Sequence, residues 1–285
     1  MNTRIIFFGS SIHSLPALNK LIQNGYEITA VVTQPDRPVG RKQVMTPTPV
    51  SVFARTKNIP IIKPQSTKPI LQLKPDLLIV CYYGQKIPIE LINKVKSGGL
   101  NIHPSLLPKY RGAAPSEWAI LKGEKETGVT ILKLSEEFDE GEIISQVKES
   151  ILKDDNPENL YARLFKKGAD LLIKVLPDFL QDKIELKPQN NSKATFAPKL
   201  TKEDGEINWD ERPELIERKI RAFTPWPGSF TFVKLNGKTL RLKVLKAHLK
   251  NDKLVLDEVQ LEGKNPVSFK EFKTAYPNYS IIKSD

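Results

Sequence analysis

Short apolar runs alternate with helix-like patterns through the first part of the chain. The runs Arg4–Phe8 and Ile28–Val32 predict strands, and so does Asp76–Cys81, which is almost continuously apolar, as expected of a strand covered on both faces. Further strands are predicted around Leu100–Ile102 and over Thr127–Leu134. Because helical patterns separate these runs, the pattern favours a parallel sheet flanked by helices.

The pattern changes in the second part of the chain. A long helix is predicted over Pro157–Leu180, with a proline near its start, where proline is favoured. Residues Lys183–Glu203 are polar, rich in proline and aperiodic, which is typical of a linker. A helix is predicted over Pro213–Ala222, and the Asn236–Gly237 turn joins two strand patterns into a hairpin. A further strand at Leu254–Leu261 leaves a small β-barrel as the natural closure.

These patterns predict an α/β protein of two domains. The expected catalytic domain, residues 1–182, holds a Rossmann-like parallel sheet with flanking helices. Residues 183–203 are expected to link it to a smaller, OB-like β-barrel domain over residues 204–285.

Composition narrows the class of protein. The chain has 285 residues, of which 39% are hydrophobic and 27% charged, as in soluble globular proteins. No apolar run approaches the roughly 18 to 20 residues that cross a bilayer, and the N-terminus lacks a signal-peptide layout. Cys81 is the single cysteine, so we expect a cytoplasmic protein without an internal disulfide, and we expect it to be a monomer. Three scattered histidines predict no metal site.

Positive charge is concentrated in one region. The net charge is +11, and residues 212–253 carry eleven Lys or Arg against three acidic residues. This concentration favours contact with nucleic acid over a basic surface kept for solubility.

Candidate chemistry centres on residues 101–115, which read NIHPSLLPKYRGAAP. Asn101 and His103 end an apolar run, where alternation sends both side chains to one face, at the strand end where open sheets bind ligands. Donors fixed in this way can hold a developing negative charge. Asp139 lies in the turn FDEGE, and a carboxylate beside the imidazole would favour the imidazolium. By residue type alone, a structural histidine and a simple turn aspartate remain open; His13 and His248 are interpreted as structural.

The pattern Asn-x-His followed by Ser-Leu-Leu-Pro-x-Tyr-Arg-Gly-x-x-Pro resembles the signature of the folate-dependent formyltransferases, over nearly all of the chain. The resemblance implies transfer of the formyl group of 10-formyltetrahydrofolate, a co-substrate, with Asn101, His103 and Asp139 as catalytic residues. It also implies that the folate lies against two stretches of chain. The implied folate-binding residues are Val80, Tyr82, Gly84, Ile87, Ser105, Leu106, Leu107 and Pro108.

Two further stretches bear on the acceptor of the formyl group. The basic, proline-rich loop Thr33–Pro49 resembles the insertion with which one branch of the family enters the acceptor end of initiator tRNA, and Arg221–Pro227 resembles that branch's domain junction. The resemblance implies methionyl initiator tRNA as the partner, with formylation serving translation initiation. The implied tRNA-binding residues are Arg37, Arg41 and Lys42.

The chain also departs from the family pattern, and alternatives remain. GSSIHS replaces the usual Gly-Thr-Pro-x-Phe wording near the N-terminus, and the region after Leu245 is shorter than usual. One alternative is a sugar-nucleotide N-formyltransferase, which would share the catalytic residues but lack the Thr33–Pro49 loop. A purine-pathway transformylase would end near the first domain, and a catalytically inactive nucleic-acid-binding relative would not need all three catalytic residues.

Overall fold

The structure is a computed structural model, and it describes residues 3–40, 42–63 and 67–282. The chain divides into two compact units. The first comprises residues 1–115, 126–150 and 161–197, and the second comprises residues 116–125, 151–160 and 198–285. The domain boundaries predicted above stay a prediction.

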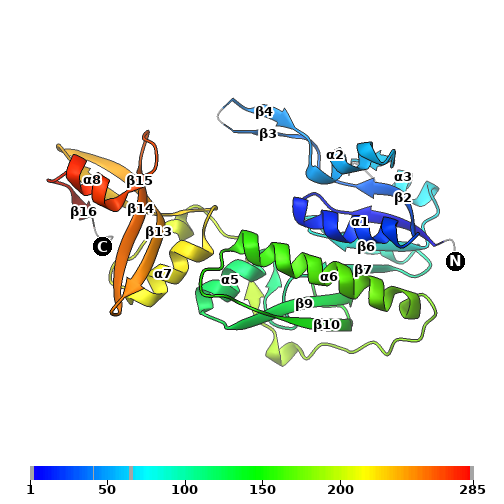
Figure 1. The fold of residues 1–285 in the computed structure, drawn as a ribbon. Coiled ribbons are helices and arrows are strands. Elements are labelled where there is room, and N and C mark those ends of the chain that lie inside the picture. Colours follow the sequence, from blue (N-terminus) through cyan, green and yellow to red (C-terminus); the bar gives the residue numbers. More distant parts are fainter. Residues whose placement is uncertain (1–2, 41, 64–66, 283–285) are drawn as a thin grey trace. The chain divides into compact units, whose positions relative to one another are not determined.

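A seven-stranded sheet, counted over the described residues, forms the centre of the first unit, in the order β10-β9-β7-β6-β1-β2-β5 (Figure 1). The strands are β1 (Arg4–Phe8), β2 (Glu27–Val32), β5 (Ile61–Ile62), β6 (Leu77–Cys81), β7 (Gly99–His103), β9 (Glu126–Lys133) and β10 (Ile143–Ser150). The strands from β7 to β5 run parallel, as predicted. The sheet is nevertheless mixed, because β9 returns antiparallel to β7 and the short turn after β9 makes β10 antiparallel in turn.

Helices cover both faces of this sheet. Helices α1 (Leu15–Gln23) and α6 (Pro157–Phe179) lie side by side on one face, where Lys20 and Asp170 form an ion pair (Figure 1). On the other face, α3 (Lys68–Gln72) and α4 (Ile89–Ile92) contribute Ile70, Leu91 and Ile92 to a core with side chains of β1 and β6. Helix α2 (Pro49–Thr56) follows the insertion after β2.

The buried strands supply the core, as their apolar runs predicted. Every residue of β6 is buried, including Cys81, and burial raises the pKa of its thiol. Burial in a continuous apolar strand is typical of a free cysteine that serves as a small core residue.

Several short elements decorate the first unit. A 3-10 helix, η1 (Ile12–Ser14), precedes α1. Strands β3 (Arg37–Val39) and β4 (Val44–Thr46) form a hairpin that projects from the sheet (Figure 1), so the predicted surface loop has regular structure. Strand β8 (Arg111–Gly112) pairs in parallel with β11 (Phe196–Ala197).

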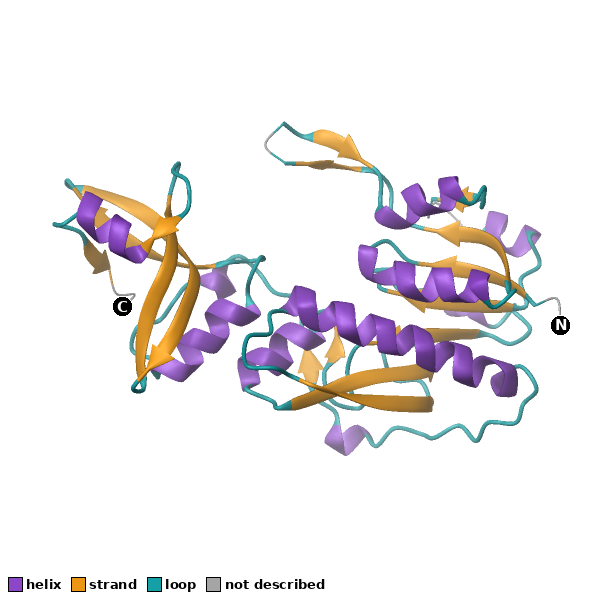
Figure 2. Ribbon diagram, viewed as in Figure 1, coloured by secondary structure: helices purple, strands orange, loops and turns teal. Residues whose placement is uncertain are grey.

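The stretch after α6 runs mostly as loop, with the single turn η2 (Asn191–Lys193) within it (Figure 2). Lys187 pairs with Ile143 at the start of β10, and β11 follows at Phe196–Ala197. Residues 183–197, predicted as a linker, are therefore hydrogen-bonded to the first unit.

An antiparallel sheet in the order β15-β14-β13-β12-β16 forms the centre of the second unit. Its strands are β12 (Ser229–Leu235), β13 (Lys238–Lys250), β14 (Lys253–Leu261), β15 (Val267–Ser268) and β16 (Ser280–Ile282). The Asn236–Gly237 turn joins β12 to β13, as predicted. Among the described residues no ladder pairs β15 with β16, so closure into a barrel stays a prediction.

Helices complete the second unit. Helix α7 (Pro213–Ala222) has the predicted bounds and buries Ile216 and Ile220 against the sheet. Helix α8 (Phe269–Ala275) adds Phe272 to the same core, and α5 (Pro115–Lys122) and the 3-10 turn η3 (Glu203–Gly205) are the remaining helical elements.

None of the helices in the described residues combines the length and the apolar character that crossing a bilayer requires.

Candidate active site

The site begins at the carboxyl end of β7. Asn101 and His103 are alternate residues of this strand, so their side chains leave the same face of the sheet. The two side chains converge on Asp139, which follows β9 in the turn before β10. The three residues that the sequence predicts as catalytic are thus together in one place.

Direct contacts join these three residues. Asn101 Nδ2 donates to Asp139 Oδ1 at 3.2 Å, and His103 Nδ1 lies 3.3 Å from the same oxygen. The second imidazole nitrogen, His103 Nε2, lies 2.9 Å from the carbonyl oxygen of Tyr110. Because a carbonyl oxygen can only accept, Nε2 must carry a hydrogen, and Nδ1 is the atom left to act beside Asp139.

The backbone fixes Asp139 from the other side. Gly112 N–H donates to Asp139 Oδ2 at 2.9 Å, so the carboxylate accepts from three different residues. Gly112 has φ of +118°, and a Cβ there would lie 2.7 Å from the carbonyl oxygen of Ala197, so glycine is required at this donor. Asp139 itself has φ of 58°, in the left-handed region that aspartate tolerates.

Burial and charge act against each other in this pair. Burial opposes the charge on His103, but the Asp139 carboxylate and the hydrogen bond to Tyr110 outweigh it, so the pKa of His103 lies above its ordinary value. Burial opposes the charge on Asp139 as well, and His103, Gly112 and Arg111 outweigh it, so the pKa of Asp139 lies below its ordinary value. Each member of the pair therefore favours the charged form of the other.

A cavity of about 380 Å³ opens onto Asn101, His103 and Asp139. Three of the residues predicted to contact folate, Val80, Tyr82 and Gly84, line it. Ile87, another of them, lines an adjoining pocket of about 60 Å³ together with Val80, Asn101 and Asp139. This size and the predominantly apolar lining suit a planar organic molecule, since ligand pockets commonly enclose about 300 to 1,000 Å³.

The other four predicted folate residues, Ser105, Leu106, Leu107 and Pro108, do not line either cavity. They form a turn that is fixed to the sheet instead. Leu107 N–H donates to Thr130 Oγ1 at 3.1 Å, Thr130 Oγ1 donates to the carbonyl of Ser105 at 2.7 Å, and Ser105 Oγ donates to the carbonyl of Lys109 at 2.7 Å. Their assignment to folate binding stays a prediction.

A cluster of aromatic side chains forms part of the cavity wall, and the sequence analysis did not predict this cluster. Tyr82, Tyr161 and Phe165 line the cavity, and the ring of His13 packs on all three, with its centroid 5.8 Å from that of Phe165 at an interplanar angle of 20°. His13, which the sequence analysis interprets as structural, thus packs against the aromatic side chains of the cavity wall. These ring contacts join η1 to α6, which lies far along the chain, and a local sequence pattern could not show them.

His248, the third histidine, also has a partner that the sequence did not predict. Its Nδ1 lies 2.9 Å from the Asp257 carboxylate, across β13 and β14 of the second unit. The pair is partly exposed, which is typical of a surface ion pair of small energetic weight.

Two of the three predicted tRNA-binding residues lie on the β3–β4 hairpin. Arg37 and Lys42 are exposed, and Arg37 Nη2 donates to Gln34 Oε1 at 3.3 Å. Arg41 lies outside the described residues. The hairpin also exposes Val39, Val44 and Met45, which suits a surface that meets a partner.

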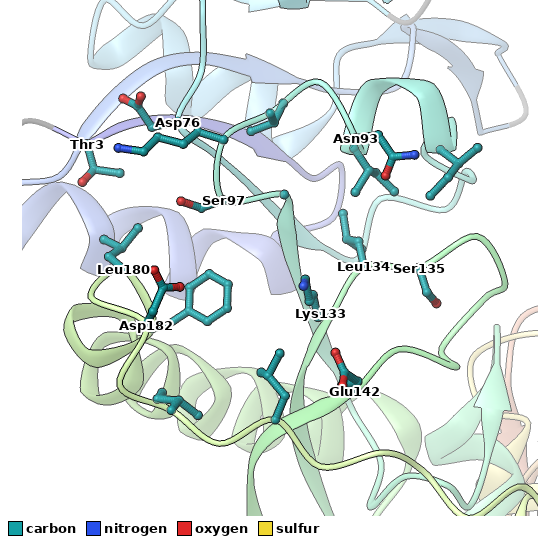
Figure 3. A pocket seen from close by; sticks show the side chains of 18 residues that line it. Thr3, Asp76, Asn93, Ser97, Lys133, Leu134, Ser135, Glu142, Leu180 and Asp182 are labelled. Atoms are coloured by element: carbon teal, nitrogen blue, oxygen red, sulfur yellow. The ribbon is translucent and has the colours of Figure 1, made fainter.

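A larger hollow of about 860 Å³ lies at the opposite end of the sheet (Figure 3). Residues before β1, β6 and β7 line it together with the end of β9, and they include Thr3, Asp76, Lys133 and Glu142. Its charges are of both signs and no imidazole lines it, so it lacks the converging donors of the smaller cavity. Among the described residues, no three His, Cys, Asp or Glu side chains gather where they could hold a metal ion.

Two family profiles match the chain. One, described as formyl transferase, matches residues 3–176, and the other, the formyl transferase C-terminal domain, matches residues 199–254.

Individual proteins agree with these matches. A methionyl-tRNA formyltransferase of Halalkalibacterium halodurans is 43% identical over 245 residues, covering 84% of this chain and 77% of the relative. That of Geobacter sulfurreducens is 37% identical over 299 residues, covering 96% and 94%. Among solved structures, an N-formyltransferase of Helicobacter canadensis in complex with folinic acid and dTDP-3-aminofucose has a TM-score of 0.69 at 23% identity, covering 88% of this chain and 89% of that chain. This last likeness concerns the fold.

Proposed function

Because the chain belongs to the formyl transferase family, we propose that it transfers the formyl group of 10-formyltetrahydrofolate to the amino group of methionyl initiator tRNA. The product, N-formylmethionyl-tRNA, would serve translation initiation. The observation that carries the chemistry is the contact of Asn101, His103 and Asp139 at the mouth of one cavity.

His103 and Asn101 would stabilise the negative charge that develops on the formyl oxygen during attack by the amine. Asp139 outweighs the effect of burial and raises the pKa of His103, so the imidazolium would bring its positive charge beside the cavity while its Nδ1–H points to Asp139 and its Nε2–H to the carbonyl of Tyr110. Asn101 Nδ2 has a second hydrogen for the same oxygen, because a primary amide carries two. Donors fixed by other bonds before the reaction keep their full electrostatic value.

Asp139 would keep the imidazole charged and would take part in moving the proton. The attacking nitrogen must lose a proton and the departing folate nitrogen must gain one. Asp139 is the carboxylate in contact with both His103 and Asn101, so it is the group placed for this exchange. Its lowered pKa makes it a weak base, so holding His103 protonated is its larger task.

The cavity lined by Val80, Tyr82 and Gly84 is the proposed folate site, with Ile87 beside it. Its volume and apolar lining fit the flat ring system of the co-substrate. For Ser105–Pro108, whose side chains line neither cavity, we propose a supporting role behind the site.

The acceptor is proposed from the relatives and from the β3–β4 hairpin. The relatives named above that are 37% and 43% identical are methionyl-tRNA formyltransferases. Arg37 and Lys42, with Arg41, would meet the phosphates of the tRNA acceptor end, and the basic strands of the second unit would hold more of its backbone. Such contacts position a nucleic acid without reading its sequence.

Incubation with 10-formyltetrahydrofolate and charged initiator tRNA tests this proposal, with an amino sugar nucleotide as the competing acceptor. We expect N-formylmethionyl-tRNA and no formylated sugar. Formylation of the sugar alone would establish the alternative activity, and no formyl transfer to either acceptor would reject the proposal.

A further inference from the structure

The stretch 187–197, which the sequence pattern predicts as a linker, reaches the candidate site at both of its ends. Lys187 pairs with Ile143 beside the turn that carries the catalytic carboxylate, and Phe196 pairs with Arg111 in β8. The stretch is therefore paired with the backbone on both sides of the turn 139–141, at Ile143 and at Arg111.

Gln189 lies between these two attachments, and every bonding position of its amide is used. Its Nε2 donates to the carbonyl oxygens of Asp139 and Gly141, both at 2.7 Å. Its Oε1 accepts from Arg111 Nε at 3.2 Å and from Arg111 Nη2 at 2.8 Å. A primary amide offers two hydrogens and one oxygen with two lone pairs, so Gln189 has no capacity left.

Arg111 fixes the other side of Gln189. Arg111 is 3% exposed. Its Nη1 lies 2.7 Å from Glu140 Oε1, and its Nη2 donates to Asn191 Oδ1 at 2.7 Å. A buried guanidinium keeps its charge only when it is paired in this way. Gln189 is hydrogen-bonded to Asp139 and Gly141, and Arg111 is paired with Glu140 between them. One connected network therefore fixes all three residues of the turn.

The turn 139–141 combines a left-handed residue with a position that admits no side chain, so its backbone needs the hydrogen bonds of this network. Asp139 adopts a left-handed φ of 58°, and a Cβ at Gly141 would lie 1.8 Å from the carbonyl oxygen of Lys133. Conformations of this kind persist where the surrounding structure fixes them. The angle at which the Asp139 carboxylate meets His103 depends on this backbone.

We propose that Gln189 is a positioning residue, which sets the Asp139 carboxylate against His103 through the backbone of the turn. The proposal rests on the function proposed above, because it assigns Gln189 a part in the same reaction. Gln189 itself contacts no reacting atom.

Replacement of Gln189 by Glu tests the donor side of this network. The carboxylate has no hydrogens for the two carbonyl oxygens, while it still accepts from Arg111. We expect kcat to fall about tenfold to a hundredfold with the KM for tRNA nearly unchanged, since small displacements of catalytic groups have such effects on the chemical step. Gln189→Met, of similar length and without charge, should give a loss of the same order.

Asn190→Asp is the matched control. Asn190 is exposed, and its Oδ1 accepts from Ser192 N–H and Oγ–H, bonds that a carboxylate keeps. The same amide-to-carboxylate change one residue away should leave kcat within about twofold, as ordinary surface substitutions do.

The double variant Asp139→Asn, Gln189→Glu separates positioning from general support of the fold. If Gln189 acts through Asp139, its replacement should cost almost nothing further once the carboxylate is gone, because coupled residues are not additive. Losses that multiply in the double variant would contradict the proposal.

An NMR titration of His103 gives a readout that does not depend on activity, and the chain has only three histidines to assign. Gln189→Met should lower the pKa of His103, because the displaced Asp139 carboxylate stabilises the imidazolium less and the methionine brings no charge of its own. An unchanged His103 titration in folded Gln189→Met would overturn the inference. An inactive wild-type protein whose His103 responds as expected would instead reject only the proposed function.

Discussion

Two hollows lie at opposite ends of one sheet, and they differ in what they contain. The larger, of about 860 Å³, has charged and polar residues spread around it, including Asp76, Lys133 and Glu142. The smaller, of about 380 Å³, is lined by Asn101, His103 and Asp139, and the first two both contact the Asp139 carboxylate. Volume therefore does not identify the site; convergence of donors on one buried carboxylate does.

The reason for the difference lies in the strand ends. At the carboxyl end of β7, two alternate side chains leave the same face, and the turn after β9 brings a carboxylate to meet them. At the opposite end, the residues that precede β1, β6 and β7 come from separate connections. No common geometry orders their side chains, which agrees with the rule that open sheets bind ligands beyond the carboxyl ends of their strands.

The largest expected effect is that of His103→Ala in the smaller cavity. Loss of the charged donor should lower kcat about a hundredfold to a thousandfold, as removal of an oxyanion donor does in other enzymes. Steady-state formylation of charged initiator tRNA measures this, and a tRNA binding assay should show an affinity close to that of the wild type. Activity equal to the wild type would remove His103 from the reaction.

Asp139→Asn should have the next largest effect, and the effect should depend on pH. The wild-type pKa of His103 is raised, so the imidazolium is present at low pH and is lost as pH rises through that pKa. Without the carboxylate, burial opposes the imidazolium and only the hydrogen bond to Tyr110 supports it, so the pKa of His103 should fall. The falling limb of kcat/KM against pH should therefore move to lower pH, and a profile that only drops in height would contradict the assigned role.

The same pair should also shape stability against pH. The raised pKa of His103 stabilises the fold below the unfolded value of about 6.5, and this stabilisation is lost as pH rises through the folded value. The lowered pKa of Asp139 stabilises the fold above about 3.9, and this stabilisation is lost as pH falls through the folded value. The contribution of the pair is therefore greatest at mildly acidic pH. Denaturant unfolding across pH should show the His103 contribution reversed in Asp139→Asn, where stability should fall as pH drops below about 6.5 because the pKa of the buried imidazole is then lowered.

Arg37→Ala and Lys42→Ala, on a hairpin that lines neither hollow, should raise the KM for tRNA several-fold and leave kcat close to the wild type. Each lost phosphate contact should reduce the slope of log KM against log salt by about 1. A salt series of tRNA kinetics measures both quantities. Unchanged slopes in both variants would move the acceptor contact elsewhere.

The smallest effect is expected in the larger hollow. Asp182→Asn removes a charge that faces this hollow (Figure 3), and it should change formylation by less than about twofold. A large loss of activity in a folded Asp182→Asn protein would show that the larger hollow takes part in the reaction.

Local patterns predicted much of the fold. The bounds of β1 and α7 agree with the expectation, and β2, β6, β9 and α6 differ from it by a residue or so at an end. Burial on both faces leaves continuous apolar runs, and helical burial leaves a stripe, so these elements are written into neighbouring residues. The antiparallel pairing of β9 with β7 is not, because the direction of a strand depends on tertiary packing and not on its own residues.

The sequence by itself determined the identity of the catalytic candidates, because Asn101 and His103 share a strand face and a long signature surrounds them. Only the tertiary structure decided that Asp139 lies 3.2 Å from Asn101 and 3.3 Å from His103, and that His13 packs on the aromatic wall of the cavity. It also decided that Ser105–Pro108 lines neither cavity and that Gln189 is hydrogen-bonded to the turn. Spacing along a chain fixes direction only within one element. Contacts between elements far apart in sequence depend on the strand register and on the face of each element that packs against the other. Hydrogen bonds between the packed elements then satisfy their buried polar groups.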